Sequence, residues 1–294
     1  MKSISERIRN GEVLVSDGAW GTFLHKRGLG EDCPELWNVT HRDDVFAIAQ
    51  SYIDAGSDMI LTNSFGGSPS KLQHYGLEER TFELNEAAAV ISREAAGDDH
   101  YVLGSIGPTG VMLMMGMVTE DTLLDGFKIQ AEALQKGGVD AICIETMSAI
   151  DEATLAIRAA REVTDLEIIC TFTFEKTATG EFRTMMGVSP EEMLHAVKEA
   201  GATIIGTNCG NGFEQMIDIV KDFRRFDAET PILVHANAGK PEFVDGQTVF
   251  PETPEMMASH VDELLAAGAN IVGGCCGSTP EHIRAIAEKI RSAK

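Results

Sequence analysis

The sequence predicts an α/β protein that folds as a single-domain (β/α)8 TIM barrel over residues 1–294. Three observations favour this fold class: eight short apolar runs, segments with helical periodicity between them, and a length that suits eight strand–helix units. No linker or shift in composition divides the chain, so we expect one domain.

Eight runs rich in β-branched and other apolar residues recur along the chain, each followed by glycine, asparagine or threonine. Near-continuous apolar runs are typical of strands buried on both faces, as in a parallel sheet. The predicted strands are Val13–Asp17, Asp58–Thr62, Tyr101–Ser105, Asp140–Glu145, Glu167–Phe172, Thr203–Thr207, Pro231–His235 and Asn270–Gly273.

The intervening segments have the apolar spacing of helices that pack on a sheet. Val45, Ile48 and Tyr52 share one helical face, as do Leu123 and Phe127. Four helix-to-strand junctions contain a glycine, which readily takes the left-handed conformation that ends a helix. These junctions span residues 55–58, 137–140, 200–203 and 267–270.

The alternative architecture is a doubly wound open sheet. Such a sheet usually carries a glycine-rich phosphate turn after its first strand. The corresponding residues here are Asp17-Gly18-Ala19-Trp20-Gly21-Thr22, which do not match the dinucleotide-binding pattern. The barrel is therefore the preferred prediction.

Charge and composition disfavour several classes of function. The net charge of −22 speaks against nucleic acid as a partner, because polyphosphate would be repelled. No run reaches the ~18 apolar residues that cross a bilayer, and residues 1–7 lack the apolar core of a signal peptide. We therefore expect a cytoplasmic protein with no membrane partner. A reducing compartment would keep the six cysteines as thiols that can bind metal.

Three of these cysteines follow two of the predicted strands. Cys209 follows the sixth strand, and Cys275 and Cys276 follow the eighth. The loops after the C-terminal ends of barrel strands surround one mouth, so these thiols can meet there. Three thiolates leave one open position on a tetrahedral zinc ion, as in catalytic sites. The alternatives are buried small hydrophobic residues, or a redox pair at Cys275 and Cys276.

The other three cysteines have no such setting. Cys143 and Cys170 lie inside predicted strands, and Cys33 lies in the long first loop without an evident companion. We expect all three to be buried packing residues, because free cysteine often behaves as a small apolar side chain.

A zinc ion held by three thiolates suits one kind of chemistry in particular. A thiol substrate that fills the open position is bound as a thiolate at neutral pH. Three sulfur ligands push electron density onto the metal, which keeps the substrate sulfur nucleophilic and makes the ion a poor Lewis acid for water. Alkyl transfer to sulfur therefore fits better than hydrolysis.

The motifs at the strand ends resemble those of the homocysteine S-methyltransferase family. This family includes the homocysteine domain of cobalamin-dependent methionine synthase and betaine–homocysteine methyltransferase. The likeness runs from residues 17–22 to residues 273–277 and implies a barrel that methylates homocysteine to methionine. Three motifs look closer to the methionine synthase branch: Thr62-Asn63-Ser64-Phe65-Gly66, Gly107-Pro108-Thr109-Gly110 and Asn237-Ala238-Gly239-Lys240-Pro241.

The resemblance implies a metal site made of four residues. Cys209, Cys275 and Cys276 match the zinc ligands, which form the catalytic centre together with the ion. Asn237 matches an asparagine that can supply the fourth ligand when substrate is absent.

The resemblance also implies a substrate site. Glu145 and Asp17 match carboxylates that hold the ammonium group of the amino acid, and two carboxylates in an acidic cup suit a cation. Asn63 and Gly107 are expected to line the same cup.

Two features depart from the resemblance and leave the methyl donor open. The long methionine synthases carry folate, cobalamin and activation modules, whereas this sequence ends at Lys294, so methylcobalamin is expected to arrive on a separate corrinoid protein. The methionine-rich stretch Met112–Met117 is either a soft apolar landing surface for a corrinoid or a loop packed on the barrel, and Met185-Met186 raises the same question. S-methylmethionine and betaine are the alternative donors.

Three further alternatives concern direction, catalysis and one histidine. The chain could run the transfer in reverse, from a methylated compound to a corrinoid protein. It could instead be a non-catalytic zinc-binding subunit of a methyl-transfer complex. His235 stands where we expect an apolar residue or proline, and is either a donor near the metal site or a satisfied core histidine.

Overall fold

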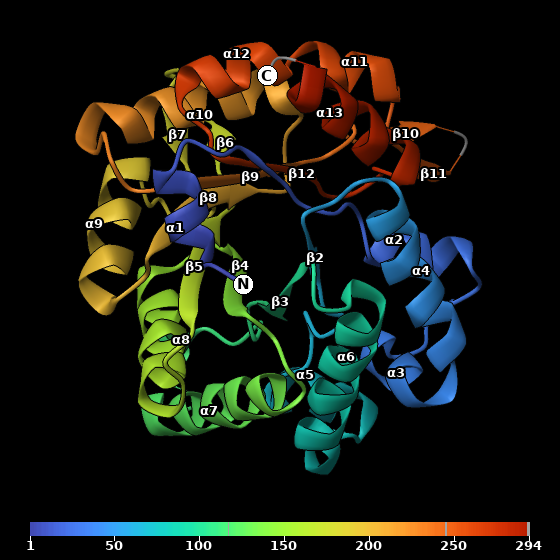
Figure 1. The fold of residues 1–294 in the computed structure, drawn as a ribbon. Coiled ribbons are helices and arrows are strands. Elements are labelled where there is room, and N and C mark those ends of the chain that lie inside the picture. Colours follow the sequence, from blue (N-terminus) through green and yellow to red (C-terminus); the bar gives the residue numbers. More distant parts are fainter. Residues whose placement is uncertain (117, 245, 293–294) are drawn as a thin grey trace.

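The computed structural model describes residues 1–116, 118–244 and 246–292. Among them, eight parallel strands form one sheet in the order β1-β12-β9-β8-β5-β4-β3-β2, which curls into a nearly closed barrel (Figure 1). All eight predicted strands are confirmed, with small differences at their ends. They are β1 (Leu14–Val15), β2 (Met59–Leu61), β3 (Tyr101–Ile106), β4 (Ala141–Met147), β5 (Glu167–Phe172), β8 (Ile204–Asn208), β9 (Ile232–Ala236) and β12 (Ile271–Gly274).

Helices connect consecutive strands and cover the outside of the barrel (Figure 1). None of the described helices is long and apolar enough to cross a bilayer. The α-helices are α1 (Ile4–Arg9), α2 (Gly21–Lys26), α3 (Trp37–Thr40), α4 (Arg42–Asp54), α5 (Pro69–Leu72), α6 (Thr81–Ala96), α7 (Glu120–Lys136), α8 (Ile150–Val163), α9 (Pro190–Ala200), α10 (Phe213–Phe226), α11 (Pro254–Ser259), α12 (Val261–Ala267) and α13 (Pro280–Ser292).

Within the described part of the chain, two β-hairpins and four short 3₁₀ turns interrupt this alternation. Both hairpins are antiparallel and lie in loops that leave the C-terminal ends of strands, namely β5 and β9. The hairpin strands are β6 (Glu175–Lys176), β7 (Phe182–Arg183), β10 (Glu242–Val244) and β11 (Gln247–Val249). The 3₁₀ turns are η1 (Pro34–Leu36), η2 (Gln73–Tyr75), η3 (Glu78–Arg80) and η4 (Leu113–Met115).

The glycine junctions between helices and strands have the predicted backbone. Gly56, Gly138, Gly201 and Gly268 all have φ between 97° and 115°, where any residue with a Cβ is strained. Each helix therefore stops at the glycine, and the next strand starts within a few residues.

The core has two layers, as a barrel requires. One apolar cluster fills the barrel interior, and a larger one lies between the strands and the outer helices. Helix α1 covers the N-terminal end of the barrel, where Ile4 and Ile8 join the interior cluster. Its first turn is held by Glu167 at the start of β5, which accepts from the backbone N–H of Ile4 at 2.7 Å. The functional residues are thus left to the opposite end.

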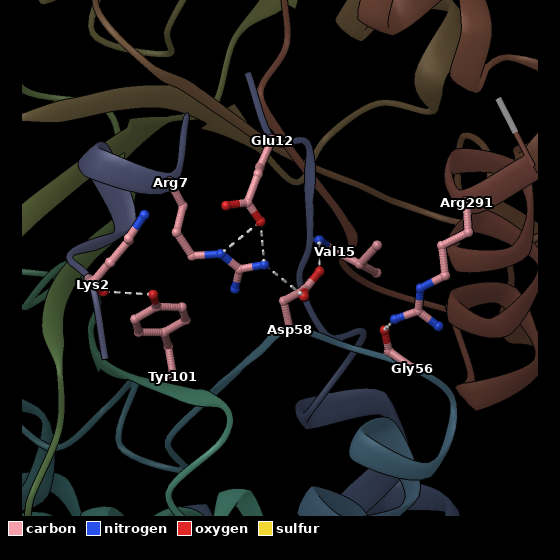
Figure 2. Close-up of polar contacts among 8 residues, drawn as sticks. All are labelled: Lys2, Arg7, Glu12, Val15, Gly56, Asp58, Tyr101 and Arg291. Carbon is pink, nitrogen blue, oxygen red and sulfur yellow. Dashed lines mark hydrogen bonds and ion pairs between the residues drawn. The ribbon is translucent and has the colours of Figure 1, made fainter. Parts of the chain in front are cut away.

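The barrel closes between β1 and β2 through side chains instead of a regular ladder. Asp58 donates its backbone N–H to the Val15 carbonyl at 2.7 Å, and its carboxylate accepts from the Val15 N–H at 2.8 Å. Figure 2 shows this carboxylate between Val15 and the guanidinium of Arg7, which also binds Glu12. At the other end of the seam, Asp17 accepts from the N–H of Leu61 at 2.8 Å.

Candidate active site

A cavity of about 340 Å³ lies at the C-terminal ends of the strands. Residues from six of the eight strand ends reach it, together with the loop between β1 and α4. The lining includes Trp20, Leu24, Glu35, Asn63, Phe65, Glu145, Thr146, Cys209, His235, Cys275 and Cys276. The cavity therefore lies at the end of the barrel where the sequence predicts the functional residues.

The three cysteines predicted as zinc ligands come together on the wall of this cavity. Their sulfur atoms all lie within 4.8 Å of one another, and the Sγ atoms of Cys209 and Cys276 are 4.0 Å apart. Sulfur ligands of a tetrahedral zinc ion lie about 3.8 Å apart. A small contraction of the cluster would thus give three corners of a tetrahedron.

Strand β9 lies between the two strands that carry the cysteines and holds their loops in place. The backbone N–H of Cys209 donates to the His235 carbonyl at 3.0 Å, and that of Cys275 donates to the Ala236 carbonyl at 2.6 Å. Cys209 itself has a φ of 60°, which is unusual for a residue other than glycine. These hydrogen bonds orient the segments after β8 and β12 so that their thiols face each other.

The electrostatics of the cluster also suit a cation. The thiols of Cys275 and Cys276 hydrogen-bond the Cys209 thiolate and lower its pKa. The interaction with that thiolate raises the pKa of Cys275 and Cys276. Neighbouring thiolates repel one another, so a divalent cation is needed for all three sulfurs to ionise together.

Asn237 lies beside this cluster. Its side chain is buried and hydrogen-bonds Cys209, yet its Oδ1 atom has no partner among the described residues. A buried carbonyl oxygen without a partner is costly, and a metal ion would satisfy it. The residues present therefore fit a zinc ion with three sulfur ligands and one oxygen ligand.

Glu145, near the end of β4, is a buried carboxylate in the cavity wall. Ser105 donates to its Oε1 atom at 2.5 Å, and Asn208 donates to its Oε2 atom at 3.4 Å. Burial raises the pKa of Glu145 to about 7, and the nearby charges of Asp17 and Cys209 act in the same direction. No cationic side chain compensates it among the described ion pairs, so an ammonium group is the complementary ligand.

Asp17 occupies a different position from Glu145. Its carboxylate is fully buried and is not part of the described cavity lining, because it accepts from Trp20 Nε1 at 2.8 Å and from the Leu61 N–H. Burial raises the pKa of Asp17 to about 6. The structure gives Asp17 two tasks: it holds the Trp20 ring against the cavity and adds negative charge near Glu145.

Asn63 and Gly107 were both expected in the cavity wall, and only Asn63 lies there. The Asn63 amide donates to the Pro34 carbonyl at 2.7 Å and ties the loop after β2 to the first loop. Gly107 acts indirectly, because a Cβ atom at this position would lie 2.6 Å from the Phe65 ring. Phe65, which does line the cavity, needs that space.

His235 lies in the cavity wall. His235 is buried as a core histidine would be, and its Nε2 atom has no hydrogen-bond partner among the described residues. Burial lowers the pKa of His235 to about 4 and keeps the ring neutral.

In the methionine-rich loop, the side chains of Met112 and Met115 are exposed, whereas Met117 lies outside the described residues. Leu113, which lies between them, packs against the core, so the loop rests on the barrel while these two methionine side chains reach solvent.

Two residues that shape the site, Glu35 in the cavity wall and Asn208 behind it, were not predicted from the sequence. Glu35 lies in the long first loop, where no motif marks it, and its carboxylate accepts from the Gly66 N–H at 2.6 Å. Asn208 precedes Cys209 in the chain, and its side-chain amide donates to Glu145 Oε2 at 3.4 Å. The remaining cysteines, Cys33, Cys143 and Cys170, are buried as predicted.

Comparisons with known proteins agree with this geometry. A sequence model described as homocysteine S-methyltransferase matches residues 14–290. The chain belongs to the homocysteine S-methyltransferase family. The family predicted from the motifs is thus confirmed, and the family consists of methyltransferase enzymes.

Two curated relatives of the family are methionine synthases. The protein of Mycobacterium tuberculosis is 31% identical over 96% of this chain, and that of Mycobacterium leprae is 31% identical over 95%. The chain spans about a quarter of the length of each, 25% and 24%. The likeness therefore concerns one portion of those longer proteins.

A solved structure supports the fold independently. The metallated homocysteine methyltransferase MmuM from Escherichia coli superposes with a TM-score of 0.78 at 20% identity, covering 97% of this chain and 98% of that one. The predicted TIM barrel is confirmed by this similarity and by the strand order.

Proposed function

We propose that the chain is a zinc-dependent S-methyltransferase that methylates the thiolate of homocysteine and forms methionine. The observation that carries this proposal is the cluster of three cysteine sulfurs on the wall of a cavity that the buried carboxylate of Glu145 also lines. A metal-binding end and an ammonium-binding end in one cavity match the two ends of an amino-acid thiol.

Cys209, Cys275 and Cys276 would hold the zinc ion, and Asn237 would be its fourth ligand without substrate. Bound there, the ion would keep the thiol of the substrate deprotonated at neutral pH. The cysteines must stay reduced for this purpose, which favours the cytoplasm as the location.

The side chains of the protein position the reactants. Glu145 accepts hydrogen bonds from the substrate ammonium group, and the negative charge of Asp17 supports it. Trp20 and Phe65 cover the cavity and exclude water from the sulfur. The substrate thiolate attacks the methyl carbon in line, and the bond between the methyl group and its carrier breaks with the electron pair staying on the carrier. Alignment therefore matters more than acid–base catalysis.

The preferred donor is a methylcorrinoid carried by a separate protein. Large apolar side chains are exposed in loops that leave the C-terminal ends of strands, among them Met112 at 48%, Met115 at 66%, Met185 at 80% and Phe243 at 78%. Exposed methionine and phenylalanine side chains at a cavity mouth are suited to contact an apolar partner surface.

A small cationic donor is the second candidate, and the cavity itself favours it. Glu35 and the ring of Phe65 line the cavity, and a carboxylate beside an aromatic face attracts a sulfonium or quaternary ammonium group. S-methylmethionine and betaine are therefore the compounds to compare with the corrinoid.

A donor screen with homocysteine tests the proposal. The zinc-loaded protein is incubated with homocysteine and, separately, free methylcobalamin, S-methylmethionine or betaine, and methionine is measured. Cys276→Ser should abolish both zinc binding and turnover, whereas Cys170→Ser, an equal change at a buried cysteine outside the cluster, should retain zinc.

Each alternative has its own signature in the screen. Bound zinc that never accelerates alkylation of a thiol by any donor would favour a non-catalytic zinc-binding subunit. Loss of methyl groups from a thioether in the presence of a corrinoid acceptor would show the reverse reaction. Full turnover by Cys276→Ser would contradict the proposal.

A further inference from the structure

We propose that Asn208 is a positioning residue that couples the two ends of the site and thereby selects amino-acid thiols over other thiols. This inference rests on the proposed function and names the element that determines its substrate specificity. Asn208 is the last residue of β8, is fully buried, and directly precedes Cys209.

The amide of Asn208 is fully engaged in the site. Its Oδ1 atom accepts from the Thr146 N–H at 2.9 Å and from the Thr171 hydroxyl at 2.7 Å. Its Nδ2 atom donates to the Thr146 hydroxyl at 2.7 Å and more weakly to Glu145 Oε2 at 3.4 Å. Thr146 is thus held at both its backbone and its side chain by one amide group.

Thr146 needs these two hydrogen bonds because its backbone is strained. Its φ is 61°, and a β-branched residue is rarely found in this left-handed region. Glu145 directly precedes Thr146, so relaxation of Thr146 to negative φ would turn the chain and move the Glu145 carboxylate. We therefore infer that Asn208 fixes where the substrate ammonium group is held.

The same residue is linked to the metal end of the cavity. Cys209 follows Asn208 in the chain and also has a left-handed backbone, with a φ of 60°. The distance between the Glu145 carboxylate and the Cys209 sulfur therefore depends on the side chain of Asn208. A ligand that uses both ends depends on Asn208, whereas a ligand that uses only the sulfur end does not.

Paired binding measurements test this role without any methyl donor. Homocysteine and 4-mercaptobutanoate share the thiol and the carboxylate, but only homocysteine has the amino group. Isothermal titration calorimetry on the zinc-loaded protein gives both affinities, with zinc content measured for each variant. In Asn208→Ala we expect homocysteine affinity to fall about 10-fold to 100-fold, in line with the cost of the strain released. The affinity for 4-mercaptobutanoate should change by less than about twofold.

Asn270→Ala is the matched control at the opposite end of the barrel. Asn270 is also an asparagine that holds two elements, since its Oδ1 atom accepts from the Ile232 N–H at 2.9 Å and from Arg224 at 3.0 Å. Loss of these bonds should lower stability and leave both affinities unchanged. A general loss of stability is thereby separated from a positioning effect.

A double mutant tests whether the Asn208 amide holds the strained backbone of Thr146. Glycine takes positive φ without strain, so in a Thr146→Gly background the further change Asn208→Ala should cost much less homocysteine affinity than it does alone. Should Asn208→Ala fail to fold or to bind zinc, Thr171→Val removes only the hydroxyl behind the amide and should weaken homocysteine binding alone.

Three results would overturn the inference. They are equal losses for both thiols, additive effects of Thr146→Gly and Asn208→Ala, and unchanged homocysteine affinity in the Asn208 and Thr171 variants. Failure of the unmodified, zinc-loaded protein to bind homocysteine is a different result, because it would overturn the proposed function and with it the basis of the inference.

Discussion

Replacing Glu145 by glutamine should stabilise the free protein while it weakens homocysteine binding. Burial raises the pKa of this carboxyl from 4.5 to about 7, so the folded protein binds the proton more tightly than the unfolded chain. The carboxyl therefore contributes its full stability below about pH 4.5 and loses it as the pH rises through about 7. At pH 8 the charged Glu145 is a net cost to folding.

The size of this cost follows from the shift in pKa. Each tenfold change in the acid constant corresponds to about 1.4 kcal/mol. The full difference for Glu145 thus approaches about 3 kcal/mol at pH 8, and glutamine, which stays neutral, should recover about 1–3 kcal/mol of it. The Ser105 hydroxyl can still donate to the amide oxygen of glutamine, so little hydrogen bonding is lost.

Urea unfolding at pH 5 and pH 8 measures this effect. The stabilisation by Glu145→Gln should be large at pH 8 and fall to about 1 kcal/mol or less at pH 5, where the native carboxyl is protonated and only the unfolded chain ionises. Glu199→Gln, at an exposed position on α9, is the control for the loss of one negative charge from the acidic chain. It should change stability by less than about 0.5 kcal/mol at either pH.

Binding should change in the opposite direction. Homocysteine affinity of the unmodified protein should rise between pH 6 and pH 8 as Glu145 ionises, and this part of the pH dependence should be missing in Glu145→Gln. The difference between the two proteins isolates Glu145 from the proton released by the substrate thiol. A variant that is less stable at pH 8, or that keeps both the affinity and its pH dependence, would refute the reasoning.

Three further changes have defined outcomes. Cys275→Ser should reduce zinc content, measured by atomic absorption, to that of the apoprotein, because two sulfurs and one hydroxyl bind zinc poorly. Asp58→Ala should lower the free energy of unfolding by about 1.5–3 kcal/mol, measured in urea, because a charge-assisted bond to the Val15 N–H at the barrel seam is lost. Gly107→Ala should displace Phe65 and lower both homocysteine affinity by calorimetry and stability, by about 1–3 kcal/mol for the latter.

The strands could be predicted because their signals are local. A strand buried on both faces is a short apolar run, and β5 has the predicted bounds Glu167–Phe172. Strand β1 is shorter than the predicted Val13–Asp17, since Asp17 and Asp58 close the seam with side chains where a ladder would otherwise continue. Carboxylate hydrogen bonds replace backbone hydrogen bonds at this seam. They join two segments that are distant in sequence, so no local sequence pattern predicts them.

The hairpins after β5 and β9 escaped prediction for a related reason. Their strands have only two or three residues, too few for a periodic pattern. They matter because they place Phe243 and its neighbours in the loops at the same end as the cavity.

The site itself was predictable where one residue type has one dominant chemistry. Three cysteines after two strands indicate metal binding, and the structure brings all three together. Asparagine carries no such signal, because Asn208, Asn237 and Asn63 all lie at or just after strand ends and yet have three different sets of partners. Glu35 reaches the cavity only through the packing of its loop on Gly66, which no spacing in the sequence reveals.

Several features that cost folding free energy lie in or beside the cavity. Among the residues that the structure describes, Glu145 has no cationic partner, and one buried polar atom each of Asn237 and His235 has no hydrogen-bond partner. Thr146 and Cys209 have left-handed backbones, which are strained for residues other than glycine. Zinc and an amino-acid thiol together would satisfy at least the first two of these, so their binding energy offsets costs that the empty fold must carry. Since only a ligand with both a thiol and an ammonium group meets the metal end and Glu145 at once, the same costs that weaken the fold favour homocysteine over simpler thiols.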